Sequence, residues 1–203
     1  MHEILITGFT PFDGRPVNAS WIAASALART GEFHGHPVRA IEIPVCWGAP
    51  RMALEQALLA GTPSLILGMG EGEPGIFRLE TRARNERRER ADNAGRVPAG
   101  EPNSPNGPME RHSSFPCQPL RDVLVGQGIP VRLSEDAGAY LCEELLYTLE
   151  EFKGSKPGIE HVLFVHVPPW GTALTWQGSP RVCDEALLSE FGEALLAAIL
   201  PQP

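Results

Sequence analysis

The sequence lacks the features of several large protein classes. Its four cysteines (Cys46, Cys117, Cys142 and Cys183) lie far apart and form no CxxC pair. This spacing predicts neither a zinc knuckle nor a disulfide framework, so we expect reduced thiols in a cytoplasmic protein. No apolar run approaches the roughly 18 residues of a membrane span, and Glu3 stands where a signal peptide has positive charge. We therefore expect neither export nor membrane insertion.

Positive charge is also in deficit. The chain has 17 basic and 25 acidic residues, a net charge of -8, which repels phosphate backbones and anionic lipid. The basic run at residues 81–90 alternates with glutamates and contains no aromatic side chain, which favours a solvated face over an RNA-binding one. Nucleic acid and membrane are therefore not expected partners. The 203 residues, 42% of them hydrophobic, predict one soluble globular domain over 1–203.

Strand-like and helical segments alternate along most of the chain. Short β-branched or apolar runs predict strands, and 3.6-residue periodicity predicts helices. Strands are expected at 3–9, 38–45, 63–69, 130–134 and 161–167. Helices are expected at 19–30 with Asn18 as N-cap, at 49–61, at 118–128, at 134–152 with Cys142 about one turn inside the start, and from about 181 to 199. Because the strands lack polar alternation, helices should cover both faces of the sheet. The predicted fold is a three-layer α/β/α sandwich with a mostly parallel, twisted central sheet.

A segment at about residues 70–116 interrupts this alternation of strands and helices. The segment is rich in Gly, Pro, Asn and charge, and only Phe77–Arg84 alternates like a half-exposed strand or hairpin arm. Long loops inside compact domains are usually functional or disordered. We therefore expect a long loop-like insertion that forms part of a site.

Cys142 is the first candidate for chemistry. It is predicted within the first turn of its helix, where the partial positive charge of the helix terminus favours a nucleophilic thiolate. The alternative is a small buried hydrophobe, because Leu145, Leu146 and Leu149 share an apolar face with it.

His166 and Glu80 are the next candidates. His166 ends an apolar strand, just before a proline pair, at the sheet edge where ligands of α/β proteins gather. It could take the proton of a thiol nucleophile, or be a core histidine bonded to a carbonyl. Glu80 lies among arginines, which indicates a solvated ion pair, but a carboxylate could also orient the imidazole.

Glycines recur at Gly68, Gly70 and Gly72. A dinucleotide fingerprint needs G-x-G-x-x-G opening a helix, yet Pro74 and a strand-like segment follow, so a tight loop lining a pocket is favoured. The glycines alone also leave open the hypothesis of a nucleotide-handling α/β protein, which requires a nucleotide bound at this loop.

Five segments of the chain are distinctive when taken together: the opening ILITGFTPFDGRPVNASW, then RLETRARN, DNAGRVP, DAGAYLCEELLY and FVHVP. They resemble segments of the pyroglutamyl peptidases of the pyrrolidone-carboxylate peptidase type. The opening resembles that family's G-F-x-P-F segment and N-x-S-W helix start, and the other four resemble the segments around its catalytic glutamate, cysteine and histidine. These segments occur in the family's order and span nearly the whole chain.

The resemblance implies roles for the three candidates. Cys142 falls on the nucleophile, His166 on the base and Glu80 on the carboxylate that orients the base. The implied activity is removal of an N-terminal pyroglutamyl residue from a peptide substrate through a thioester, without cofactor or metal, in a cytoplasmic homo-oligomer that is often a tetramer. One arginine would support the developing charge, and Arg88 and Arg90 align equally well with it.

The resemblance also implies a substrate pocket. Phe9 and Phe12 match aromatic positions that would sandwich a flat lactam ring, and Tyr140 and Leu141 stand where the family usually has Phe and Val. Met69 replaces the family's usual glutamine.

Acidic residues add to this departure from the family pattern. Glu143 replaces an asparagine beside the nucleophile, and Glu135-Asp136 replaces a neutral pair. Acidic groups near a thiolate raise its pKa. The alternative function is therefore a divergent, weakly active or inactive homologue that binds a small lactam or a peptide N-terminus.

Overall fold

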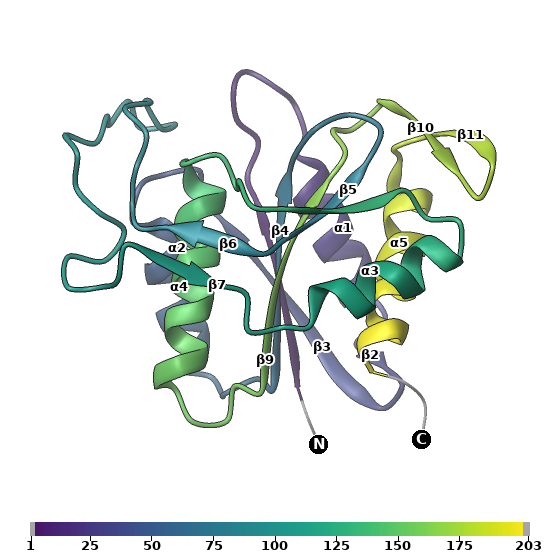
Figure 1. The fold of residues 1–203 in the computed structure, drawn as a ribbon, viewed down its shortest axis with the longest axis horizontal. Helices are drawn as coiled ribbons and strands as arrows, with labels where there is room; N and C mark the ends of the chain where they lie inside the picture. The colour runs from purple at the N-terminus through teal and green to yellow at the C-terminus, as the bar shows by residue number, and fades with distance from the viewer. Residues whose placement is uncertain (1–2, 201–203) are drawn as a thin grey trace.

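A seven-stranded sheet forms the centre of the computed structural model, which describes residues 3–200. Its strand order is β2-β3-β1-β4-β9-β5-β8. The strands are β1 (Ile4–Phe9), β2 (Glu32–Phe33), β3 (His36–Ile43), β4 (Leu65–Glu71), β5 (Phe77–Glu80), β8 (Val131–Ser134) and β9 (His161–Val167). Only the β2–β3 and β5–β9 pairs are antiparallel. The predicted mostly parallel sheet is confirmed (Figure 1).

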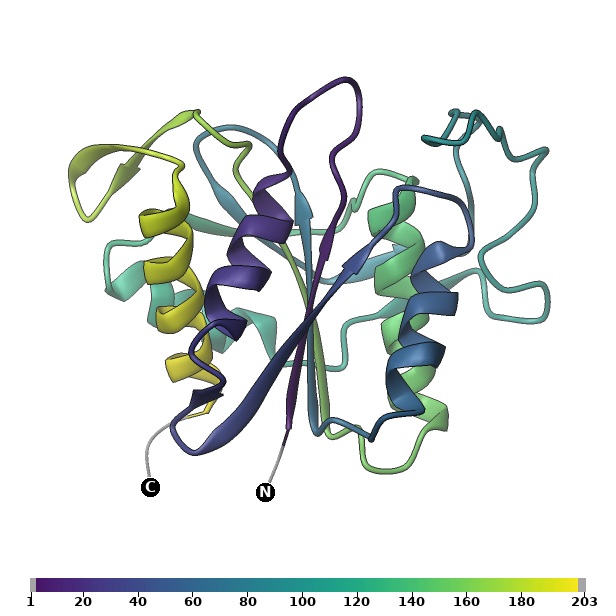
Figure 2. The ribbon, with the colours of Figure 1, turned by 180° about the vertical axis from the view of Figure 1, so that it is seen from behind.

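Helices cover both faces of this sheet (Figures 1 and 2). α1 (Ala19–Ala28), α3 (Cys117–Gly126) and α5 (Glu185–Ile199) pack on one face. α2 (Ala49–Leu58) and α4 (Leu141–Ser155) pack on the other. Each face of the sheet buries its own apolar cluster, as expected for a sheet that helices cover on both faces. The three-layer architecture is therefore confirmed, and none of the helices within residues 3–200 has the length and apolar character for crossing a membrane.

The segment expected as an insertion contributes to the sheet. β5 lies between β9 and β8, and Phe77 and Leu79 point into the core on the α1 face. Arg78 and Glu80 occupy the alternate positions of this strand, because successive side chains point to opposite faces. β6 (Arg82–Arg84) then pairs with β7 (Glu110–His112), while residues 85–109 contain no helix or strand. The strand-like alternation of Phe77–Arg84 is thus confirmed, but the sequence did not predict that β5 lies inside the central sheet.

Two helix starts differ from expectation. α5 begins at Glu185 with Asp184 as its N-cap, because the residues before it form a hairpin of β10 (Ala173–Trp176) and β11 (Ser179–Val182). The helix that carries Cys142 begins only at Leu141. Gly138 and Ala139 have φ values of 95° and 52°, a left-handed conformation that cannot belong to a right-handed helix. Cys142 therefore lies in the first turn, as predicted.

Candidate active site

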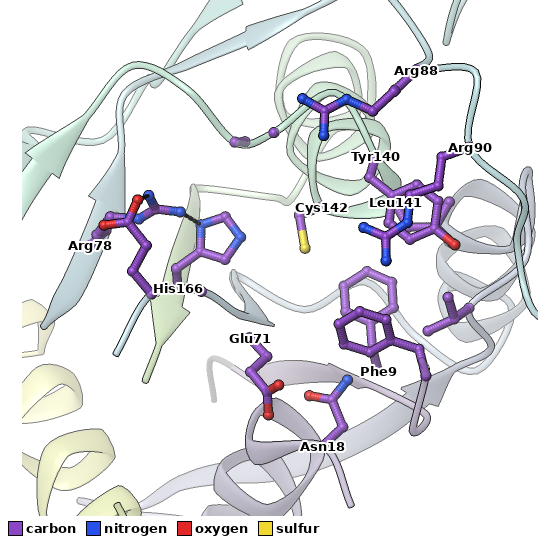
Figure 3. A pocket seen from close by; sticks show the side chains of 16 residues that line it. Phe9, Asn18, Glu71, Arg78, Arg88, Arg90, Tyr140, Leu141, Cys142 and His166 are labelled. Carbon is purple, nitrogen blue, oxygen red and sulfur yellow. Dashed lines mark hydrogen bonds and ion pairs between the residues drawn. The ribbon is translucent and has the colours of Figure 1, made fainter. Parts of the chain in front are cut away.

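A pocket of about 420 Å³ opens where β1, β4 and β9 end and α4 begins (Figure 3). These three strands are parallel, so their carboxyl ends meet at one edge of the sheet, where α/β proteins bind ligands. The pocket is lined by Phe9, Phe12, Asn18, Val45, Glu71, Gly72, Glu73, Arg78, Arg88, Arg90, Ala137, Gly138, Tyr140, Leu141, Cys142 and His166. Side chains from far apart in the sequence thus share one cavity.

Gly70 of β4 and Gly72, directly after the strand, make room for the reactive side chains. A Cβ at Gly70 would lie 2.6 Å from Sγ of Cys142 and 3.3 Å from Cδ2 of His166. A Cβ at Gly72 would lie 2.7 Å from Cβ of His166. The thiol and the imidazole therefore both lie against one point on the backbone of β4. The alternating glycines Gly68, Gly70 and Gly72 carry no side chains that would fill this space. A strand, β5, and not a helix comes after them, so the segment is not a dinucleotide-binding fingerprint.

The sheet register brings His166 to Glu80. Arg78 of β5 pairs with His166 across the antiparallel ladder, and Glu80 follows two residues later on the same face. Nδ1 of His166 lies 2.7 Å from Oε1 of Glu80. Both side chains are buried, so Glu80 is not a solvated ion pair. With Nδ1 engaged by the carboxylate, Nε2 is the ring nitrogen that can accept a proton.

The Cys142 thiol is partly exposed in the pocket. Burial among protein atoms raises the pKa of this thiol to about 12, and the carboxylates of Glu80, Glu143 and Glu71 add to the rise. The Arg78 guanidinium acts in the opposite direction. The thiol is therefore protonated at neutral pH and needs a base. The expectation that acidic neighbours raise this pKa is correct for Glu143.

Glu143 itself does not point into the pocket. Its buried carboxylate accepts hydrogen bonds from the backbone N–H groups of Ala139 (2.8 Å) and Arg84 (2.5 Å). It also pairs with the Arg84 guanidinium at 3.2 Å. Glu143 thus ties the loop before α4 to β6, which fixes the position of the Cys142 turn.

Apolar side chains line the wall of the pocket beside the thiol. Phe9, Phe12, Tyr140 and Leu141 lie there together, as the resemblance implies. The Tyr140 hydroxyl donates to the carbonyl of Ala91 at 3.0 Å, which holds the ring in place. The wall combines flat rings with one aliphatic side chain.

Arg88 and Arg90 both line the pocket but differ in their contacts. The Arg90 guanidinium pairs with Asp13 at 2.7 Å and lies over the rings of Tyr140 and Phe12, 4.7 and 5.8 Å from their centroids. Arg88 is exposed, and its backbone N–H donates to the carbonyl of Ala139 at 2.7 Å. Arg90 braces the aromatic wall, while Arg88 is held beside the start of α4.

Met69, which the resemblance implies as a substrate-pocket residue, does not line the pocket. Its side chain is fully buried in the core on the α1 face. Glu71, two residues later on the same strand, lies in the lining instead. Its carboxylate accepts the backbone N–H of Ala19 at 3.0 Å and pairs with Arg15. Glu71 was not predicted as a pocket residue, because the strand was expected to end at Met69.

Asn18 and Arg78 also line the pocket without having been predicted there. Asn18 was predicted only as a helix cap, and its Oδ1 does accept the backbone N–H of Ser20 at 3.0 Å. The signal for Arg78 was its place two residues before Glu80 in an alternating run. Residues 3–200 contain no cluster of three or more His, Cys, Asp or Glu side chains arranged to hold a metal ion.

A thiol, an imidazole and a carboxylate thus meet beside an apolar pocket. Thiol hydrolases use these three groups as nucleophile, base and orienting acid. An α/β sandwich with this site has the make-up of a hydrolase.

Comparisons with known proteins agree. Residues 2–199 match the pyroglutamyl peptidase family. A pyrrolidone-carboxylate peptidase of Streptomyces coelicolor is 33% identical over 100% of this chain and 94% of its own length. One from Escherichia fergusonii is 30% identical over 98% and 94%. The crystal structure of pyroglutamyl peptidase I from Bacillus amyloliquefaciens has a TM-score of 0.83 at 26% identity, covering 98% of this chain and 97% of that one. A mutant pyrrolidone carboxyl peptidase from Pyrococcus furiosus has a TM-score of 0.85 at 25% identity, covering 98% of both chains.

The chain belongs to the pyroglutamyl peptidase family. It is therefore a hydrolase and a protease, and the family resemblance seen in its sequence is confirmed.

Proposed function

We propose that this pyroglutamyl peptidase removes an N-terminal pyroglutamyl residue from peptides by forming a thioester on Cys142. The observation that carries the proposal is that Sγ of Cys142 and the His166 ring both lie against Gly70. Glu80 contacts the imidazole through Nδ1, on the other side of the ring. A nucleophile, a base and an orienting carboxylate in this order are the requirement for acyl transfer through a covalent intermediate.

The first half of the reaction forms the thioester. Nε2 of His166 takes the proton of Cys142 as Sγ bonds to the carbonyl carbon of the pyroglutamyl residue. Because the thiol pKa is about 12, the proton leaves as the new bond forms. The bond from this carbon to the peptide nitrogen then breaks, and His166 gives its proton to the departing amine.

The start of α4 supports the oxyanion in this proposal. α4 has no side-chain cap, so its first backbone N–H groups are open to an incoming oxygen. Such preorganised donors stabilise the charge that develops on the carbonyl. Arg88 adds charge support from the loop beside Ala139, because Arg90 is engaged by Asp13.

Water completes the cycle. His166 removes a proton from a water molecule, whose oxygen bonds to the thioester carbon, and the Cys142 thiol is regenerated as pyroglutamate leaves. Glu80 keeps the same ring orientation throughout. No other reactant is needed for the atoms to balance.

The pocket wall supports a lactam as the group bound. Phe9 and Phe12 offer flat apolar surface, and Leu141 and Tyr140 close the side next to the thiol. A five-membered lactam ring carries no charge, so moving it out of water costs far less than moving a charged group. Charged amino-terminal residues would lose their solvation in the same place.

We also propose that the enzyme is a single domain over 1–203 that works as a cytoplasmic homo-oligomer, as a tetramer. Reduced thiols fit this compartment, and all four cysteines are free. The resemblance to the family supports the oligomer. Light scattering after size-exclusion chromatography measures the subunit count, and a monomer at working concentration would contradict it.

Release of a fluorogenic amine from a pyroglutamyl amide tests the proposal, with wild type and Cys142→Ala assayed under reducing conditions. We expect turnover by wild type and none by the variant, with the same melting temperature. The raised thiol pKa favours one second candidate, a weakly active homologue that binds the lactam. Saturable binding by folded wild type without turnover would select that candidate.

A further inference from the structure

The Arg78 side chain is largely buried inside the site and has no part in the reaction described above. It is 12% exposed, and its three nitrogens face three different partners. Nη1 lies 3.1 Å from Oε1 of Glu73, Nε 3.2 Å from Oε1 of Glu80, and Nη2 3.2 Å from Nδ1 of His166. The register explains the last contact, since Arg78 and His166 are directly opposed on β5 and β9.

Nδ1 of His166 thus faces a carboxylate and a guanidinium at once. If Nδ1 carries a proton, it donates to Glu80 at 2.7 Å, and Nε2 is free to accept the thiol proton. If Arg78 donates to Nδ1 instead, the ring proton sits on Nε2, and the imidazole cannot act as a base toward Cys142. The two arrangements are a working and a non-working tautomer.

The burial of Glu80 selects the working tautomer. Its side chain is fully buried, and Oε2 has no hydrogen-bond partner within residues 3–200. A buried carboxylate needs compensating donors and charge. The ring N–H of His166 supplies the donor and Arg78 supplies the charge, so this pairing favours the tautomer with its proton on Nδ1.

The same guanidinium places a permanent positive charge beside the ring. A variant that lacks this charge has less to oppose protonation of the ring. Other charged or titratable groups around the site come from β4 and the loop after it, from α4 and from residues 88–90. They are Glu71, Glu73, Cys142, Glu143, Arg88 and Arg90. Of all these groups, Glu80 and Arg78 alone are recorded in contact with Nδ1.

We propose that Arg78 is a positioning residue of this reaction, which holds the Glu80 carboxylate on Nδ1 of His166 and thereby keeps Nε2 free to take the Cys142 proton. The inference rests on the proposed function. Glu73 anchors the guanidinium from the glycine-rich loop, and Arg132 of β8 shares that anchor at 2.5 Å.

The pH profile of kcat/KM on a pyroglutamyl amide tests the role, using Arg78→Met, Arg78→Lys and Arg132→Met. Arg132 is the register partner of Arg78 on β8 and pairs with Glu73, so Arg132→Met removes an equal charge without touching His166. We expect Arg78→Met to move the acid limb to higher pH by about one unit. Arg78→Lys should return it toward wild type, and Arg132→Met should leave it in place.

Two readouts need no turnover. Nitrogen NMR of the imidazole, assigned among the six histidines with His166→Ala, should show Nδ1–H in neutral wild type. In Arg78→Met the ring should stay protonated to higher pH. Alkylation of Cys142 by iodoacetamide near pH 9 should slow about tenfold in Arg78→Met, because a cation that favours the thiolate is lost.

A merely structural role for Arg78 predicts a different pattern. Activity would then fall equally at every pH in both Arg78 variants, with an unshifted profile and an unchanged imidazole titration. That result would overturn the inference. If wild type does not hydrolyse pyroglutamyl amides, the proposed function fails, while the NMR and alkylation experiments still decide the role of Arg78.

Discussion

Substituting Gly70 by alanine tests the geometry of the site most sharply. The new Cβ would lie 2.6 Å from Sγ of Cys142 and 2.9 Å from Cζ of Phe164. Non-bonded atoms prefer about 3.5–4.0 Å, so the thiol must move by roughly 1 Å. β4 cannot yield, because β1 and β9 pair with it on both sides.

The expected loss follows from this displacement. A misplacement of about 1 Å at the reacting centre costs about 10²-fold in rate, and overpacking costs about 1–3 kcal/mol of unfolding free energy. For a chain of this length the melting temperature falls by roughly 2–12 °C. We therefore expect Gly70→Ala to fold and to have a kcat/KM reduced by about 10²-fold or more.

Gly154→Ala is the matched control. Gly154 lies in α4, the helix of Cys142, and a Cβ there meets nothing within 4 Å. This variant should keep full activity and gain about 0.5–1 kcal/mol of stability. Hydrolysis of a pyroglutamyl amide and thermal unfolding measure both effects. A Gly70→Ala enzyme with wild-type kcat/KM would refute the placement of Cys142 against β4.

Three further predictions follow from the buried groups. Glu80→Gln removes the charge behind His166, so steady-state kinetics should show kcat/KM lower by about 10²-fold or more, with a melting temperature within a few degrees of wild type. Glu143→Ala leaves the N–H groups of Ala139 and Arg84 without their acceptor, and urea unfolding should show a loss of about 1–3 kcal/mol for each. Burial raises the pKa of the Cys142 and Cys183 thiols to about 12, so the unfolded chain ionises at lower pH than the folded one. Stability should therefore be complete below about pH 9 and fall between about pH 9 and 12; Cys142→Ala should lessen the slope by about 1.4 kcal/mol per pH unit.

The sequence predicts the fold because the elements that build it carry strong local patterns. β9 was expected at His161–Val167 and is found there, since an uninterrupted apolar run before two prolines has few other interpretations. β5 was expected only as a half-exposed strand or hairpin arm, and the β10–β11 hairpin was not expected. β5 is only four residues long, and its partners β9 and β8 come from distant parts of the chain, so local periodicity does not reveal its place inside the sheet. The two strands of the β10–β11 hairpin are also four residues long, too short for a clear alternating pattern.

The site was predicted unevenly for a related reason. Cys142, His166 and Glu80 were predicted because each sits at a recognisable place in a resembling segment, and the structure brings the three side chains together. Glu71 and Arg78 depend on register instead. A strand that runs two residues further than expected brings Glu71 into the pocket, and an antiparallel pairing with β9 brings Arg78 to the imidazole.

Mass spectrometry of the acyl-enzyme tests the central claim most directly. Wild-type protein mixed with a pyroglutamyl amide and quenched with acid within one turnover should carry one added pyroglutamyl group, located on the proteolytic peptide that contains Cys142. The added group should disappear on the timescale of turnover and be absent from Cys142→Ala. Turnover by Cys142→Ala at the wild-type rate, or an acyl group found on another residue, would contradict the account.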